Sequence, residues 1–209
     1  NNCKNCITTM KIKEAIGYFT ENLLKAGVFD PAFDTIYIFE YVLSYSRAQL
    51  NIFGDKELSD EEFATISKMV ERRKNGEPVQ YILGHWYFMG RKYFVDYGVL
   101  IPRDDTEVLV RECMTLFDKN DDIKILDLCS GSGIIAITLQ KHFEKAKVTA
   151  VEKSEIAYDF LLKNCSEKTS AEDVIVDISN PQGILPVYGT VSQVYVDKIA
   201  AGETKEVSI

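Results

Sequence analysis

At its centre the chain reads Ile125-Leu-Asp-Leu-Cys-Ser-Gly-Ser-Gly133, where a run of apolar residues leads into a glycine-rich turn. Residues 134–142 follow with apolar side chains at helical spacing, so this region predicts a strand, a turn and a helix. Gly131 and Gly133 allow a tight turn and let the backbone approach a ligand closely. In folds built from such units the ligand lies outside the carboxyl ends of the strands. We therefore expect a small-molecule site at this turn.

The C-terminal half of the chain alternates between short apolar segments and amphipathic ones. Strands are expected at 123–128, 147–151, 173–178, 192–197 and 206–209, and helices at 134–142 and 154–165. Strands that alternate with helices predict an α/β fold, in which helices cover a parallel sheet.

The N-terminal third of the chain predicts a small bundle of three helices. Apolar residues recur at helical spacing over residues 12–23, and Gly27 is placed to end that helix. A second helix is expected to begin at Pro31. A third is expected to begin at Ser59, which forms a capping box with Glu62.

Aromatic and β-branched residues crowd together over residues 81–95, interrupted by Met89-Gly90. This pattern predicts a β-hairpin between the helices and the glycine-rich turn. We therefore divide the chain into a helical domain at 1–75, a hairpin linker at 76–103 and an α/β domain at 104–209.

Composition and charge argue against several classes of protein. The 209 residues carry 32 acidic and 24 basic side chains, a net charge of −8, whereas binding to nucleic acid phosphates depends on Lys and Arg. No apolar run approaches the roughly 20 residues that span a bilayer. We expect a cytoplasmic protein without direct contact to membrane or nucleic acid. Cys3 and Cys6 form a C-x-x-C pair, but zinc needs about four ligands, so no metal site is expected.

Two carboxylates indicate which ligand the turn binds. Glu152 ends a predicted strand 19 positions after Gly133, where a carboxylate can hold the hydroxyl groups of a ribose. The spacing Gly131-x-Gly133-x-x-Ala136 also fits a dinucleotide, but Asp127 would then face a pyrophosphate at close range, which is costly. S-adenosylmethionine carries an ammonium and a sulfonium and no phosphate, so Asp127 favours this cofactor over NAD. In the alternative interpretation, Asp127 only caps the following turn.

Three stretches of the sequence carry a resemblance to a known family. They read Gly76-Glu-Pro-Val-Gln-Tyr-Ile-Leu-Gly84, Val99-Leu-Ile-Pro-Arg-Asp-Asp-Thr-Glu107 and Leu126-Asp-Leu-Cys-Ser-Gly-Ser-Gly133. In order and spacing, the chain resembles the HemK/PrmC protein-glutamine N5-methyltransferases from about Gly17 to Cys165. The resemblance implies a class I (Rossmann-like) methyltransferase domain that uses S-adenosylmethionine. It implies as acceptor the glutamine of the Gly-Gly-Gln loop of peptide-chain release factors, with a helical domain that helps to hold the release factor. We expect a monomer.

The resemblance also implies roles for individual residues. Those that would line the methionine part of the cofactor are Cys129, Ser130, Gly131, Ser132 and Gly133. Glu152 would bind the ribose. Residues near the substrate and the interdomain joint would be Arg103, Asp105, Thr106 and Glu107. Arg103 is expected to pair with a carboxylate, in a scaffolding or a substrate-contacting role.

The family's catalytic N-P-P-Y signature is only half present. Asn180 and Pro181 match it, whereas Gln182 and Gly183 stand in place of Pro and Tyr. Asn180 is the candidate catalytic residue, because its side-chain oxygen can accept a hydrogen bond from the substrate amide. It follows Gly133 by 47 positions, where the expected strands and helices need about 60. We therefore expect the printed sequence to lack part of this domain.

Two alternatives stay open. In the first, the chain is a catalytically impaired module, which binds S-adenosylmethionine or binds a release factor. In the second, it is a nucleic-acid adenine N6-methyltransferase, since N-P-P-Y-type loops also serve adenine amino groups. The net charge of −8 opposes the second alternative.

Overall fold

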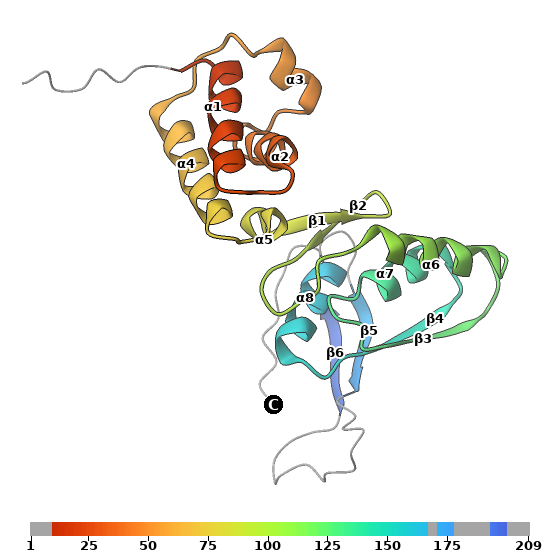
Figure 1. Cartoon of the computed structure of the whole chain (residues 1–209). Coiled ribbons are helices and arrows are strands. Elements are labelled where there is room, and N and C mark those ends of the chain that lie inside the picture. The colour runs from red at the N-terminus through yellow and green to blue at the C-terminus, as the bar shows by residue number, and fades with distance from the viewer. Residues whose placement is uncertain (1–9, 167–170, 178–192, 200–209) are drawn as a thin grey trace, which may run out of the picture. The chain divides into compact units, whose positions relative to one another are not determined.

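The computed structural model describes the backbone of residues 10–166, 171–177 and 193–199, and the side chains of residues 10–165. The chain divides into two compact units, an N-terminal unit at Asn1–Leu83 and a C-terminal unit at Gly84–Ile209 (Figure 1). This division falls inside the predicted 76–103 linker, and residues of that linker form the last helix of the N-terminal unit. The predicted boundaries at 75 and 103 stay predictions.

The described part of the N-terminal unit contains five helices. They are α1 (Ile12–Lys25), α2 (Pro31–Leu43), α3 (Arg47–Ile52), α4 (Asp60–Lys74) and α5 (Val79–Leu83). The three helices predicted from the sequence correspond to α1, α2 and α4. The other two helices were not predicted, because they have six and five residues, too few for apolar positions to recur at helical spacing.

Capping contacts confirm the predicted end of α1 and start of α4. Gly27 adopts a φ of 77°, and the amide of Val28 donates to the carbonyl of Leu23 at 3.1 Å. This is the geometry of a Schellman motif, which favours glycine. At the start of α4, the Ser59 hydroxyl accepts from the Glu62 amide at 3.2 Å, and the Glu62 carboxylate accepts from the Ser59 amide at 2.7 Å. This is the predicted capping box.

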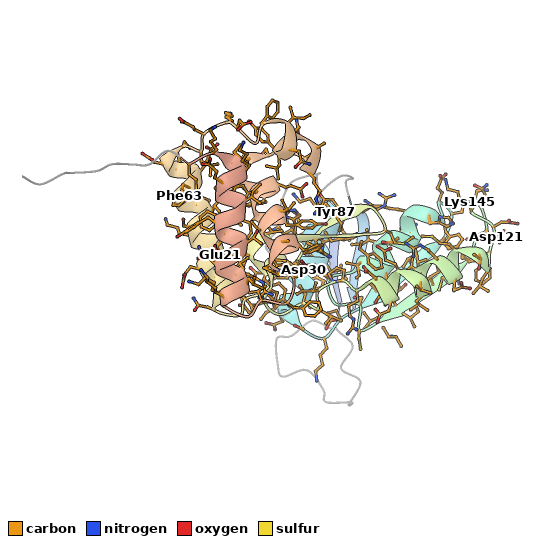
Figure 2. The ribbon with its side chains drawn as sticks, turned by 45° about the horizontal axis from the view of Figure 1, so that its top comes forward. Glu21, Asp30, Phe63, Tyr87, Asp121 and Lys145 are labelled. Atoms are coloured by element: carbon orange, nitrogen blue, oxygen red, sulfur yellow. The ribbon has the colours of Figure 1, made fainter. Side chains whose placement is uncertain are left out.

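A buried ion pair joins α2 to α4. Arg73 Nε lies 2.6 Å from Asp34 Oδ2, and the two side chains are 20% and 7% exposed. Burial raises the pKa of Asp34, while the guanidinium of Arg73 acts in the opposite direction. Because Asp34 lies in the first turns of α2 and Arg73 near the end of α4, the ion pair holds these two helix ends together. Figure 2 shows the side chains of this unit, with Asp30 at the start of α2 and Phe63 on α4.

The C-terminal unit begins with the predicted hairpin. Its strands β1 (His85–Phe88) and β2 (Arg91–Phe94) pair antiparallel. Met89 and Gly90 connect them with φ values of 50° and 71°. Positive φ at both positions is typical of a two-residue type I′ turn, whose twist matches that of the paired strands.

The remaining elements include the predicted strand–helix–strand unit. They are α6 (Asp104–Thr115), β3 (Lys124–Leu128), α7 (Ile134–His142), β4 (Lys147–Val151), α8 (Glu155–Ser166), β5 (Ala171–Asp177) and β6 (Gln193–Ile199). β3 and β4 pair in parallel and α7 connects them, as predicted. Helix α6 was not predicted, because Val110 is its one buried residue and the helix begins with charged side chains.

The expectation of one parallel sheet is wrong for β5 and β6, which pair antiparallel in a separate two-stranded sheet. A parallel connection needs a crossover, usually a helix. The alternation of strand and helix patterns along a sequence does not specify which strands become neighbours or in which direction they pair. The strand predicted at 206–209 lies outside the described residues.

One apolar cluster holds the hairpin, α6 and α7 together. Its buried members are Phe88, Tyr93, Val110, Ile137, Leu139, Phe143 and Ala146. Two of the six aromatic residues between positions 81 and 95, Phe88 and Tyr93, are buried in this cluster, whereas Tyr87 is 52% exposed. Within the described part of the chain, no helix combines the length and the apolar character that a bilayer crossing requires.

We expect the substitution Asp34→Ala to lower the free energy of unfolding by about 2–3 kcal/mol, because the mostly buried Arg73 guanidinium loses its carboxylate partner and keeps only the carbonyl of Glu77 as an acceptor. The matched control is Glu21→Ala, which removes the exposed partner of Lys25 on α1 and should change little. Urea unfolding followed by far-ultraviolet circular dichroism measures both. Equal effects of the two substitutions would show that the buried pair is not a stabilising contact.

Candidate functional site

The glycine loop, residues 129–133, joins β3 to α7. Cys129, Gly131 and Gly133 have φ values of 59°, 58° and 76°. The Ser130 amide donates to the carbonyl of Val151 at 3.0 Å, which ties the loop to the end of β4. Cys129 takes up the left-handed conformation, which is uncommon for a residue other than glycine, and its side chain is exposed. Such strain in a non-glycine residue is typical of functional sites.

Gly133 is required by close packing. A Cβ atom at this position would lie 2.9 Å from Leu161 Cγ and 3.1 Å from Ile137 Cδ1. At Gly131, by contrast, a Cβ atom would meet nothing within 4 Å. The loop therefore packs tightly against α7 and α8 at its end, and leaves open space at Gly131 where a ligand can approach.

Glu152, at the end of β4, holds the glycine loop through backbone amides. Its Oε2 accepts from the Gly131 amide at 2.7 Å, and its Oε1 accepts from the amides of Lys153 and Ser154, each at 2.8 Å. Partial burial acts to raise the pKa of Glu152, but these three donors together lower it, so the group is a carboxylate at neutral pH. A carboxylate has about four acceptor positions. Glu152 therefore keeps room for one further hydrogen bond, such as one from a ribose hydroxyl.

Asp127, near the end of β3, caps α7. Its Oδ2 accepts from the Ala136 amide at 3.1 Å. Burial raises the pKa of Asp127; the Ala136 amide lowers it, and the charge of Glu152 raises it further. The capping role that the sequence left as an alternative is therefore present. The two carboxylates also influence each other electrostatically, so this end of the sheet is acidic.

Ser130 brings an unpaired polar group to the loop. Its hydroxyl is buried and has no hydrogen-bond partner in the part of the chain that the structure describes. Ser132 is also buried, and it turns its carbonyl toward a side chain of α8. A buried hydroxyl without a partner is costly, which makes Ser130 Oγ a natural donor or acceptor for a bound ligand.

The predicted substrate segment lies at the start of α6. Arg103 Nε is 3.5 Å from Asp105 Oδ2, and both side chains are more than two-thirds exposed, so this pair contributes little stability. The Thr106 hydroxyl donates to Asp105 at 3.4 Å. Glu107 instead accepts from the Met89 amide at 2.6 Å and so holds the hairpin turn. The structure thus gives Glu107 a scaffolding contact, and the substrate roles of this segment stay predictions.

The contacts that attach the hairpin to the helices of the C-terminal unit were not predicted from the sequence. The Tyr93 and Thr138 hydroxyls lie 2.7 Å apart in the core and join β2 to α7. Asn164 of α8 bonds to Phe94 and to the glycine loop. The sequence does carry one indication of these contacts, because Asn164 is an amide residue on a helix face otherwise made of apolar residues such as Leu161. Asn180, the candidate catalytic residue, lies outside the described residues.

In sequence, the chain is similar to known proteins over both units. The N-terminal residues 14–84 match the family model described as the PrmC N-terminal domain, and residues 104–182 match the methyltransferase small domain. A protein of Fusobacterium nucleatum named release factor glutamine methyltransferase is 39% identical over 145 residues, which are 69% of this chain and 41% of that protein. The protein of the same name from Koribacter versatilis is 36% identical over 157 residues, 75% of this chain and 56% of that protein. The chain spans about half the length of the curated relatives it matches.

We expect the substitution Gly133→Ala to destabilise the C-terminal unit by about 2–4 kcal/mol, because the new methyl group clashes with Leu161 and the φ is positive. Gly131→Ala, the matched control, adds the same strain in open space and should cost about 1–2 kcal/mol. Urea unfolding followed by the fluorescence of Trp86, the single tryptophan of the chain, reports both values. The packing account is wrong if Gly131→Ala is the more damaging of the two.

Proposed function

Since the chain belongs to the HemK/PrmC family, we propose that it transfers a methyl group from S-adenosylmethionine to the glutamine of a release factor's Gly-Gly-Gln loop. The observation that carries the proposal is the glycine loop at the ends of two parallel strands, with a carboxylate from each strand beside it. The relatives named release factor glutamine methyltransferase support the choice of acceptor.

The residues of the glycine loop fit S-adenosylmethionine. Open space at Gly131 admits a ligand, and the unpaired hydroxyl of Ser130 offers it a hydrogen bond. Glu152 retains one acceptor position for a ribose hydroxyl. Asp127 adds negative charge, which favours a cationic ligand and opposes a diphosphate. The cofactor would supply a methyl group bonded to a positively charged sulfur.

The task left to the protein is to aim a weak nucleophile at that methyl group. A glutamine amide nitrogen reacts poorly, because its lone pair is delocalised into the carbonyl. Asn180 is our candidate for the side chain that accepts a hydrogen bond from this amide and orients it. Positioning of this kind lowers the activation barrier of methyl transfer, because the entropy cost of aligning the amide nitrogen with the methyl group is met when the substrate binds. We further propose that the N-terminal unit helps to hold the release factor.

We expect Asp127→Asn to weaken S-adenosylmethionine binding by about tenfold, because it removes the negative charge while the amide oxygen of Asn still caps Ala136. The neutral nucleoside 5′-methylthioadenosine should bind both proteins alike. Isothermal titration calorimetry measures both ligands. Asp122→Asn, on an exposed residue before β3, controls for the loss of one acidic charge. Unchanged affinity for S-adenosylmethionine in Asp127→Asn would remove the electrostatic basis of the proposal.

We expect methyl transfer from labelled S-adenosylmethionine to a release factor, and none to a release factor whose Gly-Gly-Gln glutamine is replaced by alanine. The assay is scintillation counting of the separated release factor, with DNA and RNA as further acceptors at low salt. Labelling of nucleic acid alone would identify an adenine methyltransferase instead. Binding of the cofactor without transfer to any acceptor would identify a module without catalytic activity.

A further inference from the structure

Asn164 lies on α8 and is 6% exposed, although its side chain is an amide. All its polar atoms are used. Its Oδ1 accepts from the Phe94 amide at 2.6 Å, and its Nδ2 donates to the carbonyl of Phe94 at 3.2 Å and to the carbonyl of Ser132 at 3.0 Å. A buried amide with every partner in place indicates a specific structural task, because each unfilled position would cost free energy.

The two contacts with Phe94 imitate a neighbouring strand. The side-chain amide offers one acceptor and one donor to the amide and carbonyl of the same residue at the end of β2. The second hydrogen of Nδ2 reaches the glycine loop. Asn164 therefore links two segments that are separate in the sequence, the end of the hairpin and the loop proposed to hold the cofactor.

The linked segments both lead to the candidate site. From Phe94 the chain continues through buried Val95 and Val99 to the start of α6, where the predicted substrate segment lies. Ser132 precedes Gly133, whose packing against Leu161 of α8 places the same loop against the same helix. One side chain thus sets the separation of the cofactor loop and the strand that precedes the substrate segment.

We propose that Asn164 is a positioning residue, whose side-chain amide fixes the Ser132 carbonyl against the end of the hairpin and so holds the glycine loop in the shape that binds cofactor. This inference rests on the proposed function. Aspartate has nearly the same shape but, when ionised, turns a negative charge toward the carbonyls of Ser132 and Phe94. Burial raises the pKa of such a carboxyl, so protonation at mildly acidic pH restores one donor.

Hydrogen exchange tests the positioning without any ligand. In Asn164→Ala the amide of Phe94 loses its acceptor and should exchange at least about tenfold faster. The amides of Gly131 and Gly133 should also exchange faster, because the loop loses its contact at the Ser132 carbonyl. In Asn164→Asp the amide of Phe94 keeps a carboxylate acceptor and should stay protected, while the loop amides exchange faster. Loop amides with unchanged exchange in both variants would overturn the inference.

Calorimetry with S-adenosylmethionine gives the second readout. At about pH 8, Asn164→Asp should bind the cofactor at least about tenfold more weakly than the unmodified chain, and the deficit should shrink at about pH 5.5. Asn164→Ala has no titratable group at this position, so its deficit should be the same at both pH values.

The titratable groups next to Asn164 do not change charge between these two pH values. Burial raises the pKa of Tyr93 and of Cys165, so both stay neutral. The Lys163 ammonium, which lies over the Phe94 ring, stays charged.

The outcomes separate the inference from the proposed function. Asn120→Asp, on an exposed residue of the same unit, controls for the added charge and should bind like the unmodified chain. If the unmodified chain binds no S-adenosylmethionine, the proposed function fails and the inference fails with it. If the unmodified chain binds and Asn164→Asp binds equally well at both pH values, only the inference fails. If Asn164→Ala does not fold, the similarly shaped aspartate variant decides.

Discussion

The hydrogen bond between the Gly131 amide and the Glu152 carboxylate holds the glycine loop, which follows β3, at the end of β4. In an α/β fold a ligand usually binds outside the carboxyl ends of the parallel strands, which is where this loop lies. The lowered pKa keeps Glu152 ionised, so this bond is charge-assisted, and the amides of Lys153 and Ser154 favour the same charged form. A negative charge therefore strengthens the anchoring of the glycine loop before any ligand arrives.

The two carboxylates beside this loop, Asp127 and Glu152, differ in their surroundings and in their roles. Asp127 caps α7, and Glu152 holds the glycine loop. Burial raises the pKa of Asp127, whereas backbone donors lower the pKa of Glu152. Asp127 faces the start of α7, where a negative charge is favoured by the helix dipole. A cation that approaches this end of the sheet meets two acids already held by hydrogen bonds, so little rearrangement is needed to receive it.

Patterns confined to a few neighbouring residues could be predicted from the sequence. The bounds of α7 and β4 were predicted to the residue, and Ser59 and Gly27 marked helix ends correctly, since each depends on local spacing or backbone conformation. Contacts between distant segments could not be predicted: the partner of Asn164 is 70 residues away, and Glu107 reaches a turn 18 residues back. The antiparallel pairing of β5 with β6 also depends on which strands are neighbours, a property that periodicity does not encode.

The hairpin at 85–94 is held in position by side chains that lie later in the sequence and are therefore synthesised after it. Glu107, Thr138 and Asn164 each supply one of its anchoring contacts. A two-stranded hairpin alone is marginally stable in water. During synthesis, which proceeds from the N-terminus, these strands emerge before any of the three helices that fasten them. The hairpin therefore gains its anchoring contacts in sequence, and the contact with Asn164 can form only after the chain has been synthesised past that residue.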